Sequence, residues 1–233
     1  MQIKRIFLGL VIALTLNSCI DVLDGNGEVV KEKRTISSFN KIDISGAYEV
    51  LINQGNDERL TIEADENLLE IIETEVRNNT LYISSKQAIG NAEALKLYIT
   101  AVNLEDIDVS GAVKLSNKGT FEAKKLAIEV SGAGVIDVDV AVENLLIDMS
   151  GASETNLKGS SDNFEISISG AGELTAKKFR TENTTIDISG AGSATVFANK
   201  TLNVSVSGAG SIEYKGSPKL TKDISGAGSV AQL

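Results

Sequence analysis

The sequence contains no histidine and no tryptophan, one cysteine, one proline and four tyrosines. Without histidine, neither a histidine-dependent catalytic triad nor a histidine metal site can form. Because Cys19 is the only cysteine, the chain has no internal disulfide. One proline and the absence of helical heptads exclude a proline-rich or coiled-coil stalk. We therefore expect no catalytic residue, no metal ligand and no cofactor site.

Positive charge is also scarce, since the chain has 22 lysines and arginines but 32 acidic residues, which gives a net charge of −10. Phosphate binding requires a basic groove, so this balance excludes nucleic acid as a partner. It also argues against electrostatic attachment to anionic lipid. Hydrophobic residues make up 42% of the chain, which is ample for a core.

The first residues have the features of an export signal. Lys4 and Arg5 precede an apolar run over 6–16, which is shorter than the roughly 20 residues that a membrane span needs. Leu16-Asn17-Ser18-Cys19 resembles the lipobox of bacterial lipoproteins, in which the cysteine becomes the lipid-modified N-terminus. The alternative is an ordinary signal peptide followed by a free or buried thiol.

We accordingly expect a signal peptide over 1–18, lipidation at Cys19 and a short flexible tether over 19–29. The lipid would supply the membrane contact. The protein would then be exported and anchored to the bacterial cell envelope, at the outer membrane.

A repeated tripeptide organises the rest of the chain. Ser-Gly-Ala begins at Ser45, Ser110, Ser131, Ser150, Ser169, Ser189, Ser207 and Ser225. From Ser110 onward the steps are 18 to 21 residues, and a fixed period of this size indicates stacked copies of one supersecondary unit.

One unit shows why the copies should be β-strands. Leu126, Ile128 and Val130 alternate with polar or small residues, and a second alternating run follows the Ser-Gly-Ala-Gly turn over 131–134. We expect Ala133 to point inward at this corner. The pattern predicts an all-β fold, a right-handed parallel β-helix (β-solenoid) with about 18–21 residues per coil, regular over 104–233.

Residues 30–103 alternate in the same way but lack the strict repeat. Alternation at 42–44, 60–62, 81–83 and 97–99 predicts strands, and Arg77-Asn78-Asn79-Thr80 predicts a turn. Ser45 and Ser110 are 65 residues apart, which is close to three periods. We therefore expect irregular β coils over 30–103, continuous with the regular part.

The residue two positions before each repeated serine is usually acidic. In chain order from the second serine this position holds Asp108, Glu129, Asp148, Ser167, Asp187, Ser205 and Asp223. Stacking would align these residues in an outward ladder, where like charges repel one another. The ladder is either a solvated face or a row of calcium ligands, but the nonapeptide motif of calcium-binding β-rolls is absent.

Two stretches carry a family resemblance, over 34–46 (RTISSFNKIDISG) and 210–218 (GSIEYKGSP). With the Ser-Gly-Ala-Gly coils they resemble the bacterial envelope lipoproteins described as putative autotransporter adhesin, head GIN domain. The resemblance spans about 30–233. It implies a β-helical fold, an envelope location and adhesion, and it supplies no catalytic residues to transfer.

Two classes of function remain. The first is a lipid-anchored, non-catalytic interaction or adhesin-like module that presents a solenoid face to a glycan or protein ligand. The second is a carbohydrate-active β-helix enzyme, a polysaccharide lyase or hydrolase, which requires paired carboxylates or a carboxylate–calcium–basic group. Asp137 with Asp139, or Lys177 and Lys178 with Arg180, are the candidates for the second class. Unlike polar residues gathered in a cleft would favour the enzyme, and uniform ladders would favour the interaction module.

The last coil ends at 229–233 (SVAQL), without a recognisable polar or helical cap. An uncovered solenoid end exposes unpaired strand edges. We expect this end to be covered by an earlier segment or used for self-association.

Overall fold

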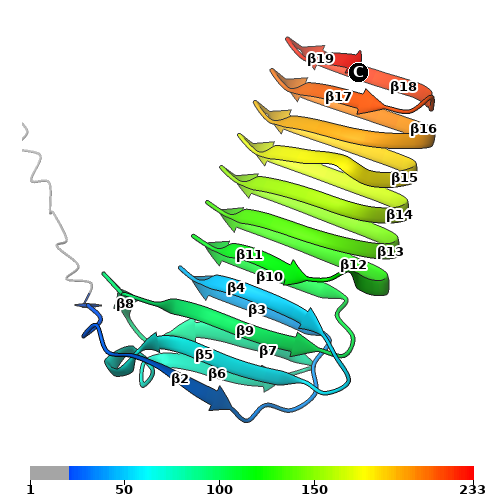
Figure 1. Ribbon diagram of the computed structural model, residues 1–233. Coiled ribbons are helices and arrows are strands. Elements are labelled where there is room, and N and C mark those ends of the chain that lie inside the picture. The colour runs from blue at the N-terminus through cyan, green and yellow to red at the C-terminus, as the bar shows by residue number, and fades with distance from the viewer. Residues whose placement is uncertain (1–20) are drawn as a thin grey trace, which may run out of the picture.

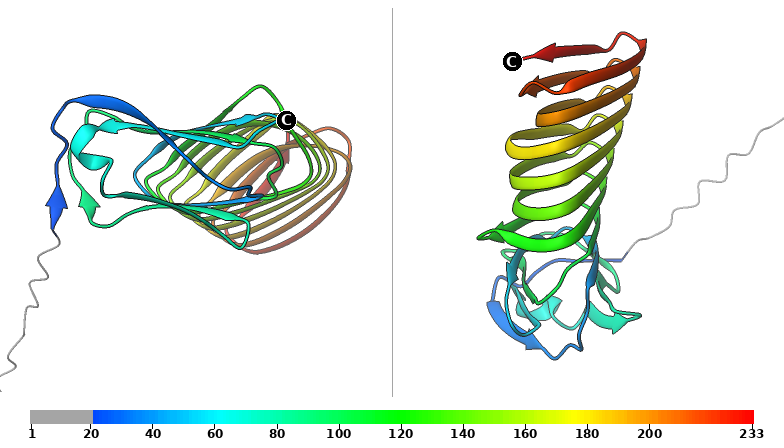
Figure 2. Two further views of the ribbon diagram at one scale, coloured as in Figure 1. Left: turned by 90° about the horizontal axis from the view of Figure 1, so that it is seen from below. Right: turned by 90° about the vertical axis from the view of Figure 1, so that its right-hand side faces the viewer.

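The computed structural model describes residues 21–233, so the predicted signal peptide and Cys19 lie outside the described residues. The described chain is a β-solenoid with a separate cap at its N-terminal end (Figure 1). Each coil is flattened and has two long sides (Figure 2). We call side A the strand that runs into the Ser-Gly-Ala turn and side B the strand that leaves it.

The coils are built from twelve strands. These are β3 (Lys41–Gly46), β4 (Glu49–Gln54), β10 (Asp106–Gly111), β11 (Lys114–Lys118), β12 (Phe121–Gly132), β13 (Val135–Gly151), β14 (Glu154–Gly170), β15 (Glu173–Gly190), β16 (Ser193–Gly208), β17 (Ser211–Lys215), β18 (Lys219–Gly226) and β19 (Ser229–Gln232). Each of the four strands β13 to β16 is long enough to form both sides of a coil. It forms side B, bends at the second corner and then forms side A.

The register confirms the parallel β-solenoid. Ser110 pairs with Ser131, Ser131 with Ser150, and the pairing continues in this way up to Ser225. Equivalent residues of successive coils thus form straight columns about 4.8 Å apart. The predicted strand alternation places one apolar column after another inside the stack.

Two side A columns show how well the interior is filled. The residues one position before the serines, such as Val130, Met149 and Ile168, are at most 2% exposed. The residues three positions before are Ile42, Ile107, Ile128, Ile147, Ile166, Ile186 and Val204. Each of these seven is at most 4% exposed. Burying two such columns between two sheets is the main source of stability in a coil that cannot fold alone.

The first glycine of the Ser-Gly-Ala-Gly turn is required for two reasons, its backbone conformation and the close approach of the next coil. Gly132 has φ +119°, and a Cβ there would lie 2.5 Å from the carbonyl oxygen of Gly111 in the coil below. Gly134 is buried, and a Cβ there would lie 2.8 Å from Val130 Cγ1. Our expectation for Ala133 was wrong, because its side chain is exposed while its N–H donates to Gly111 O at 2.9 Å.

The order of coils in space differs from the order in sequence. Ser45 pairs directly with Ser110, so the 65-residue interval contains no coil between them, contrary to our expectation. Residues 55–105 instead fold back beneath the coil of β3 and β4 (Figure 1). The chain then returns past this coil to begin β10 above it.

This inserted segment and the chain start form the cap. Its elements are β1 (Val22–Leu23), β2 (Val29–Arg34), β5 (Arg59–Asp65), the 3-10 turn η1 (Glu66–Leu68), β6 (Ile72–Arg77), β7 (Thr80–Ser85), β8 (Ala88–Ile89) and β9 (Leu95–Ala101). Strands β7 and β9 lie parallel under β3 and β4, and antiparallel pairing then joins β6 to β7, β5 to β9 and β2 to β5. The four predicted strands and the Arg77–Thr80 turn are present, with Asn78 and Asn79 at positive φ. Only 41–54 within 30–103 is an ordinary Ser-Gly-Ala coil.

The segment expected to be a flexible tether is docked on the cap from Val22 onward. Strand β1 pairs with β8, and Asp24 accepts the Asn91 N–H at 2.8 Å. Asp65 is buried and accepts N–H groups of Gly27, Glu93 and Ala94 at 3.0–3.1 Å. Burial alone would raise the pKa of Asp65, but these three donors hold it below its usual range. The free tether is therefore shorter than residues 19–29.

No earlier segment among residues 21–233 covers the far end of the stack, so for the described residues that part of our expectation was wrong. Within residues 21–233, β18 pairs with β16 alone and β19 with β17 alone. Figure 1 shows them at the opposite end of the solenoid from the cap. No helix among the described residues is long and apolar enough to cross a membrane.

Candidate functional site

The outward surface of side A, which we call face A, carries two polar columns. One is the serine column, and the other contains the residues two positions before it. From the cap upward this second column runs Glu75, Tyr82, Asp43, Asp108, Glu129, Asp148, Ser167, Asp187, Ser205 and Asp223. Acid and serine alternate from Asp148 upward, as predicted, whereas the four residues from Asp43 to Asp148 are all acidic.

Face A is hollowed over this lower part. One hollow, of about 490 Å³, lies over β6, β7 and β3, and we call it the cap groove. A second, of about 580 Å³, lies over the four adjacent acids and their serines. Asp43 and Ser45 line both hollows. The two therefore form one trough that crosses the cap and the first coils along the solenoid axis.

The cap groove gathers side chains of unlike chemistry. Its lining includes Arg34, Glu70, Glu73, Glu75, Arg77, Tyr82, Ser84 and Lys86. The Arg77 guanidinium lies 4.1 Å from the centre of the Tyr82 ring, which is close cation–π contact. These two residues come from opposite strands of the β6–β7 hairpin, which the Asn78-Asn79 turn closes.

The other two cations of the groove have protein partners. Arg34 donates from Nη2 to the Leu69 carbonyl at 2.7 Å, and its Nε lies 3.0 Å from the Glu32 carboxylate. Lys86 Nζ lies 3.8 Å from the Glu73 carboxylate. Among the described residues Arg77 has no ion pair, so its outer N–H groups can donate to a bound molecule.

The acidic part of the trough has unfavourable electrostatics. Burial raises the pKa of Asp108, and the neighbouring carboxylates of Asp43, Glu129 and Asp106 raise it further. Within residues 21–233 no ion pair reaches Asp43, Asp108, Glu129 or Asp148, since Lys41 contacts Asp106 instead, at 3.2 Å. Four uncompensated carboxylates in one column therefore cost stability.

The outward surface of side B, which we call face B, has a different arrangement of charged residues. At its base one column alternates Glu63, Lys96, Glu49 and Lys114. Lys96 lies 3.4 Å from Glu49, and Glu63 contacts Lys31 at 3.0 Å and accepts the Tyr98 hydroxyl at 2.8 Å. The Lys31 contact, followed by the Tyr98 hydrogen bond, lowers the pKa of Glu63. Charge is thus balanced at the base of face B and left unbalanced on the lower part of face A.

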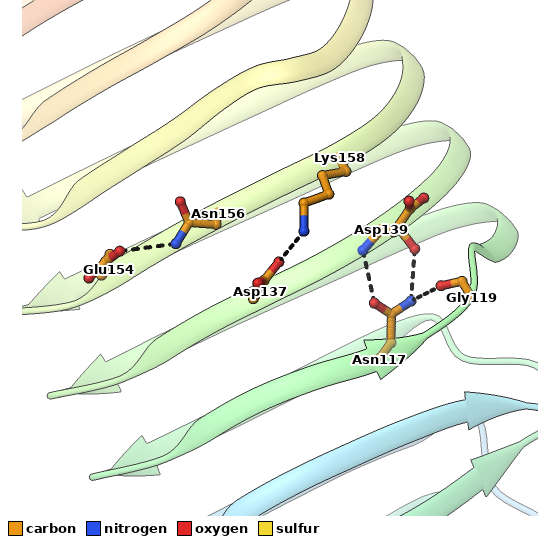
Figure 3. A network of polar contacts seen from close by, with 7 residues as sticks. All are labelled: Asn117, Gly119, Asp137, Asp139, Glu154, Asn156 and Lys158. Atoms are coloured by element: carbon orange, nitrogen blue, oxygen red, sulfur yellow. Dashed lines mark hydrogen bonds and ion pairs between the residues drawn. The ribbon is translucent and has the colours of Figure 1, made fainter.

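The predicted Asp137–Asp139 pair lies on face B (Figure 3), and both aspartates line a hollow of about 300 Å³ together with Lys158. Asp137 is paired with Lys158 at 3.0 Å. The Asp139 backbone exchanges two 2.8 Å hydrogen bonds with the Asn117 side chain, which also donates to Gly119 O at 3.0 Å. Asn117 thereby continues the sheet hydrogen bonding where β11 ends. Among the described residues, no hydrogen bond or ion pair involves the Asp139 carboxylate, while Lys158 neutralises Asp137.

The predicted basic group over 177–180 does not converge on a carboxylate pair. Lys177, Lys178 and Arg180 are exposed around a register shift in β15, and Phe179 between them is buried. Arg180 lies 5.1 Å from the centre of the Phe197 ring. This second arginine–aromatic pair lies outside the trough.

Two features were missed in the sequence. Asn144, Asn163, Asn183 and Thr201 form a hydrogen-bonded ladder at 2.9–3.1 Å along the second corner of the coils. Its signal was available, because each residue lies six positions before a repeated serine. The Arg77–Tyr82 groove had no such signal, because β2, β3, β6 and β7 meet there only after the insertion folds back.

No group of three His, Cys, Asp or Glu side chains in the part of the chain that the structure describes is arranged to hold a metal ion. The acidic column runs along the stack, and the residues of one column do not converge on one point. What the trough offers chemically is a row of hydrogen-bond acceptors and hydroxyls that ends in the arginine, lysine and tyrosine of the cap groove.

The fold and the repeat place this chain in a defined family. The family model described as putative auto-transporter adhesin, head GIN domain, matches residues 38–218, and the chain belongs to that family. No curated relative matches the chain.

Several solved structures share the fold. A putative adhesin from Bacteroides fragilis has a TM-score of 0.83 at 23% identity, covering 91% of this chain and 100% of that one. A putative adhesin from Parabacteroides distasonis has a TM-score of 0.76 at 22% identity with the same coverage. A putative lipid binding protein from Parabacteroides distasonis has a TM-score of 0.75 at 21% identity, again covering 91% and 100%. At these identities the likeness concerns the fold.

Proposed function

We propose that this protein is a non-catalytic, adhesin-like module of the bacterial cell envelope that binds a glycan in the trough of face A. The observation that carries the proposal is the continuity of the trough, because the two hollows share Asp43 and Ser45. Membership of the adhesin head family and structural neighbours named putative adhesins support an interaction role.

The chemistry of the trough favours a neutral glycan over an anionic one. Sugar hydroxyls both donate and accept, so they can pair with carboxylates, serines and the Arg77 guanidinium together. An anionic ligand would meet the repulsion of Asp43, Glu73 and Glu75. Tyr82 adds apolar surface for a sugar ring at the centre of the cap groove. A basic protein segment is the competing occupant, and it would bind the acidic part alone.

The carbohydrate-enzyme alternative has two specific points in its favour. The first is that unlike polar residues gather in the cap groove, which is the arrangement that favours an enzyme. The second is a raised pKa. A general acid needs a raised pKa, and Asp108 has one next to the carboxylates of Asp43 and Glu129. Adjacent strands lie about 4.8 Å apart, near the roughly 5–5.5 Å that separates the carboxylates of retaining glycosidases. Against this, the acids continue through four successive coils from Asp43 to Asp148, whereas a catalytic pair is a single local arrangement.

The first experiment is a glycan and matrix-protein array with residues 21–233, which contain the whole described fold. We expect binding to neutral glycans that falls at least tenfold in Tyr82→Ala. Phe197→Ala removes the aromatic ring of the other arginine–aromatic pair and should bind as wild type does. Binding to basic proteins alone, or equal loss in both variants, would contradict a glycan site in the cap groove.

The same samples separate the two functions. Array-positive polysaccharides are incubated with the protein, and new reducing ends or unsaturated products are measured. We expect none. Product formation that disappears in Asp108→Asn would establish the enzyme and overturn the non-catalytic proposal.

Lipid anchoring at Cys19 is the second part of the proposal. We expect the full-length protein to partition into the detergent phase and to carry an acylated N-terminal cysteine by mass spectrometry. Cys19→Ala should move to the aqueous phase, while Ser18→Ala, which keeps a small residue before the cysteine, should not. Detergent partitioning that survives Cys19→Ala would contradict lipidation there.

A further inference from the structure

The last coil presents open strand edges next to the end of the core. Within residues 21–233, β18 and β19 have partners on one side only. Leu220, Ile224 and Val230 pack on the core and remain partly exposed, and Leu233 is 56% exposed. Free N–H and C=O groups beside apolar side chains are a template on which another sheet can add.

One residue of this coil breaks the core pattern. Lys222 pairs with Val204 in the column three positions before the serines. All seven earlier members of that column are isoleucine or valine and at most 4% exposed. Strand alternation directs Lys222 to the core side, while its own side chain is exposed. Thus a cation replaces a core aliphatic residue in the last coil.

Side B of the last coil also has a polar residue, Gln232, in a column that begins with an apolar one. Gln232 follows Val196 and Tyr214 in a side B column. Its Nε2 donates to the Gly216 carbonyl at 2.7 Å, so it is bound within its own chain. No hydrogen bond or ion pair of the described residues holds Lys222 in the same way. Its nearest acidic neighbour in sequence, Asp223, faces the other side of the strand.

We propose that Lys222 is a gatekeeper that prevents a second copy of this chain from stacking on the C-terminal edge. Two copies joined end to end would bring Lys222 of each into the joined core, where neither ammonium meets a carboxylate. Removing both charges from water without a partner opposes the apolar attraction of Leu220, Ile224 and Val230. Inward-facing charges are a known means of protecting sheet edges. The proposal replaces the self-association expected from the sequence, which overlooked the position of Lys222.

The test is molar mass by light scattering on residues 21–233, from micromolar to about 100 µM protein. We expect wild type to remain a monomer and Lys222→Ile, which restores the aliphatic column, to double in mass with increasing concentration. Lys219→Ile is the matched control, because it lies on the same strand in the outward corner column and should stay a monomer.

Circular dichroism on each variant shows whether it is folded. Lys222→Met, which keeps the side-chain length without the charge, is a second variant with the same expected dimer. A wild-type dimer would overturn the proposal. Folded Lys222→Ile and Lys222→Met that both stay monomeric would overturn it as well.

Discussion

Individual residues explain why face A and face B differ. On face B, Lys96 lies between Glu63 and Glu49, so each charge has an opposite neighbour. On face A, Asp108 lies between Asp43 and Glu129 with no cation in the column. The lower part of face A therefore loses stability where the base of face B does not, and such conflicts are expected at functional sites.

This conflict predicts an unusual stabilising substitution. Because the pKa of Asp108 is raised in the folded protein, its ionisation opposes folding above that pKa. The penalty disappears as the pH falls below the ordinary aspartate value of about 3.9, where the unfolded chain is also protonated. Asp108→Asn should raise the free energy of unfolding at pH 7 by about 0.2–1 kcal/mol and leave it unchanged near pH 3.

Chemical denaturation at the two pH values measures this difference. Asp162→Asn, at an exposed position of β14, is the control and should have no effect at either pH. A less stable Asp108→Asn at pH 7 would show that the carboxylate is favourably bound, contrary to the electrostatics described here.

At the scale of one coil, the Ser-Gly-Ala-Gly turn determines how closely coils stack. Gly132→Ala would place a Cβ 2.5 Å from the Gly111 carbonyl oxygen and force an alanine to φ +119°. We expect a loss of roughly 2–5 kcal/mol in the free energy of unfolding. Gly119→Ala has φ +76° and open space around it, so it should cost only about 1–2 kcal/mol. Equal losses in the two variants would mean that the close approach between coils is not what requires glycine.

The coils were also the part of the fold that the sequence predicted best. Eight Ser-Gly-Ala tripeptides and the strand alternation between them predict the parallel stack and the inward columns. The cap was harder, because alternation at 60–62 or 81–83 is the same for parallel and antiparallel strands. Nothing local distinguishes a 65-residue interval of three coils from an insertion that folds back below Ser45.

The same physics limits what could be predicted of the site. The acid column repeats with the coils and could be found by counting from each serine. Arg77 and Tyr82 belong to no repeat, and only the β6–β7 hairpin and its place under β3 bring them beside Asp43. Lys222, by contrast, occupies a repeat position and could have been identified by aligning the coils.

At the scale of the whole molecule, residues 21–233 form one continuous stack of coils with the cap at its N-terminal end. Strand β1 is paired from Val22, so only two residues separate it from Cys19, and the three steps of chain between them span at most about 11 Å. With Cys19 lipidated as proposed, the cap and its groove would lie near the membrane and the Lys222 end would lie away from it. The trough would then meet glycans close to the envelope surface.

Calorimetric titration of the strongest array glycan into residues 21–233 and two arginine variants shows whether the cap groove is the glycan site. Arg77→Ala removes the free cation of the cap groove, and Arg180→Ala removes the matching cation beside Phe197 outside the trough. We predict a Kd at least tenfold weaker for Arg77→Ala and unchanged for Arg180→Ala. An unchanged Kd for Arg77→Ala, with the variant folded, would contradict the assignment of the cap groove as the glycan site.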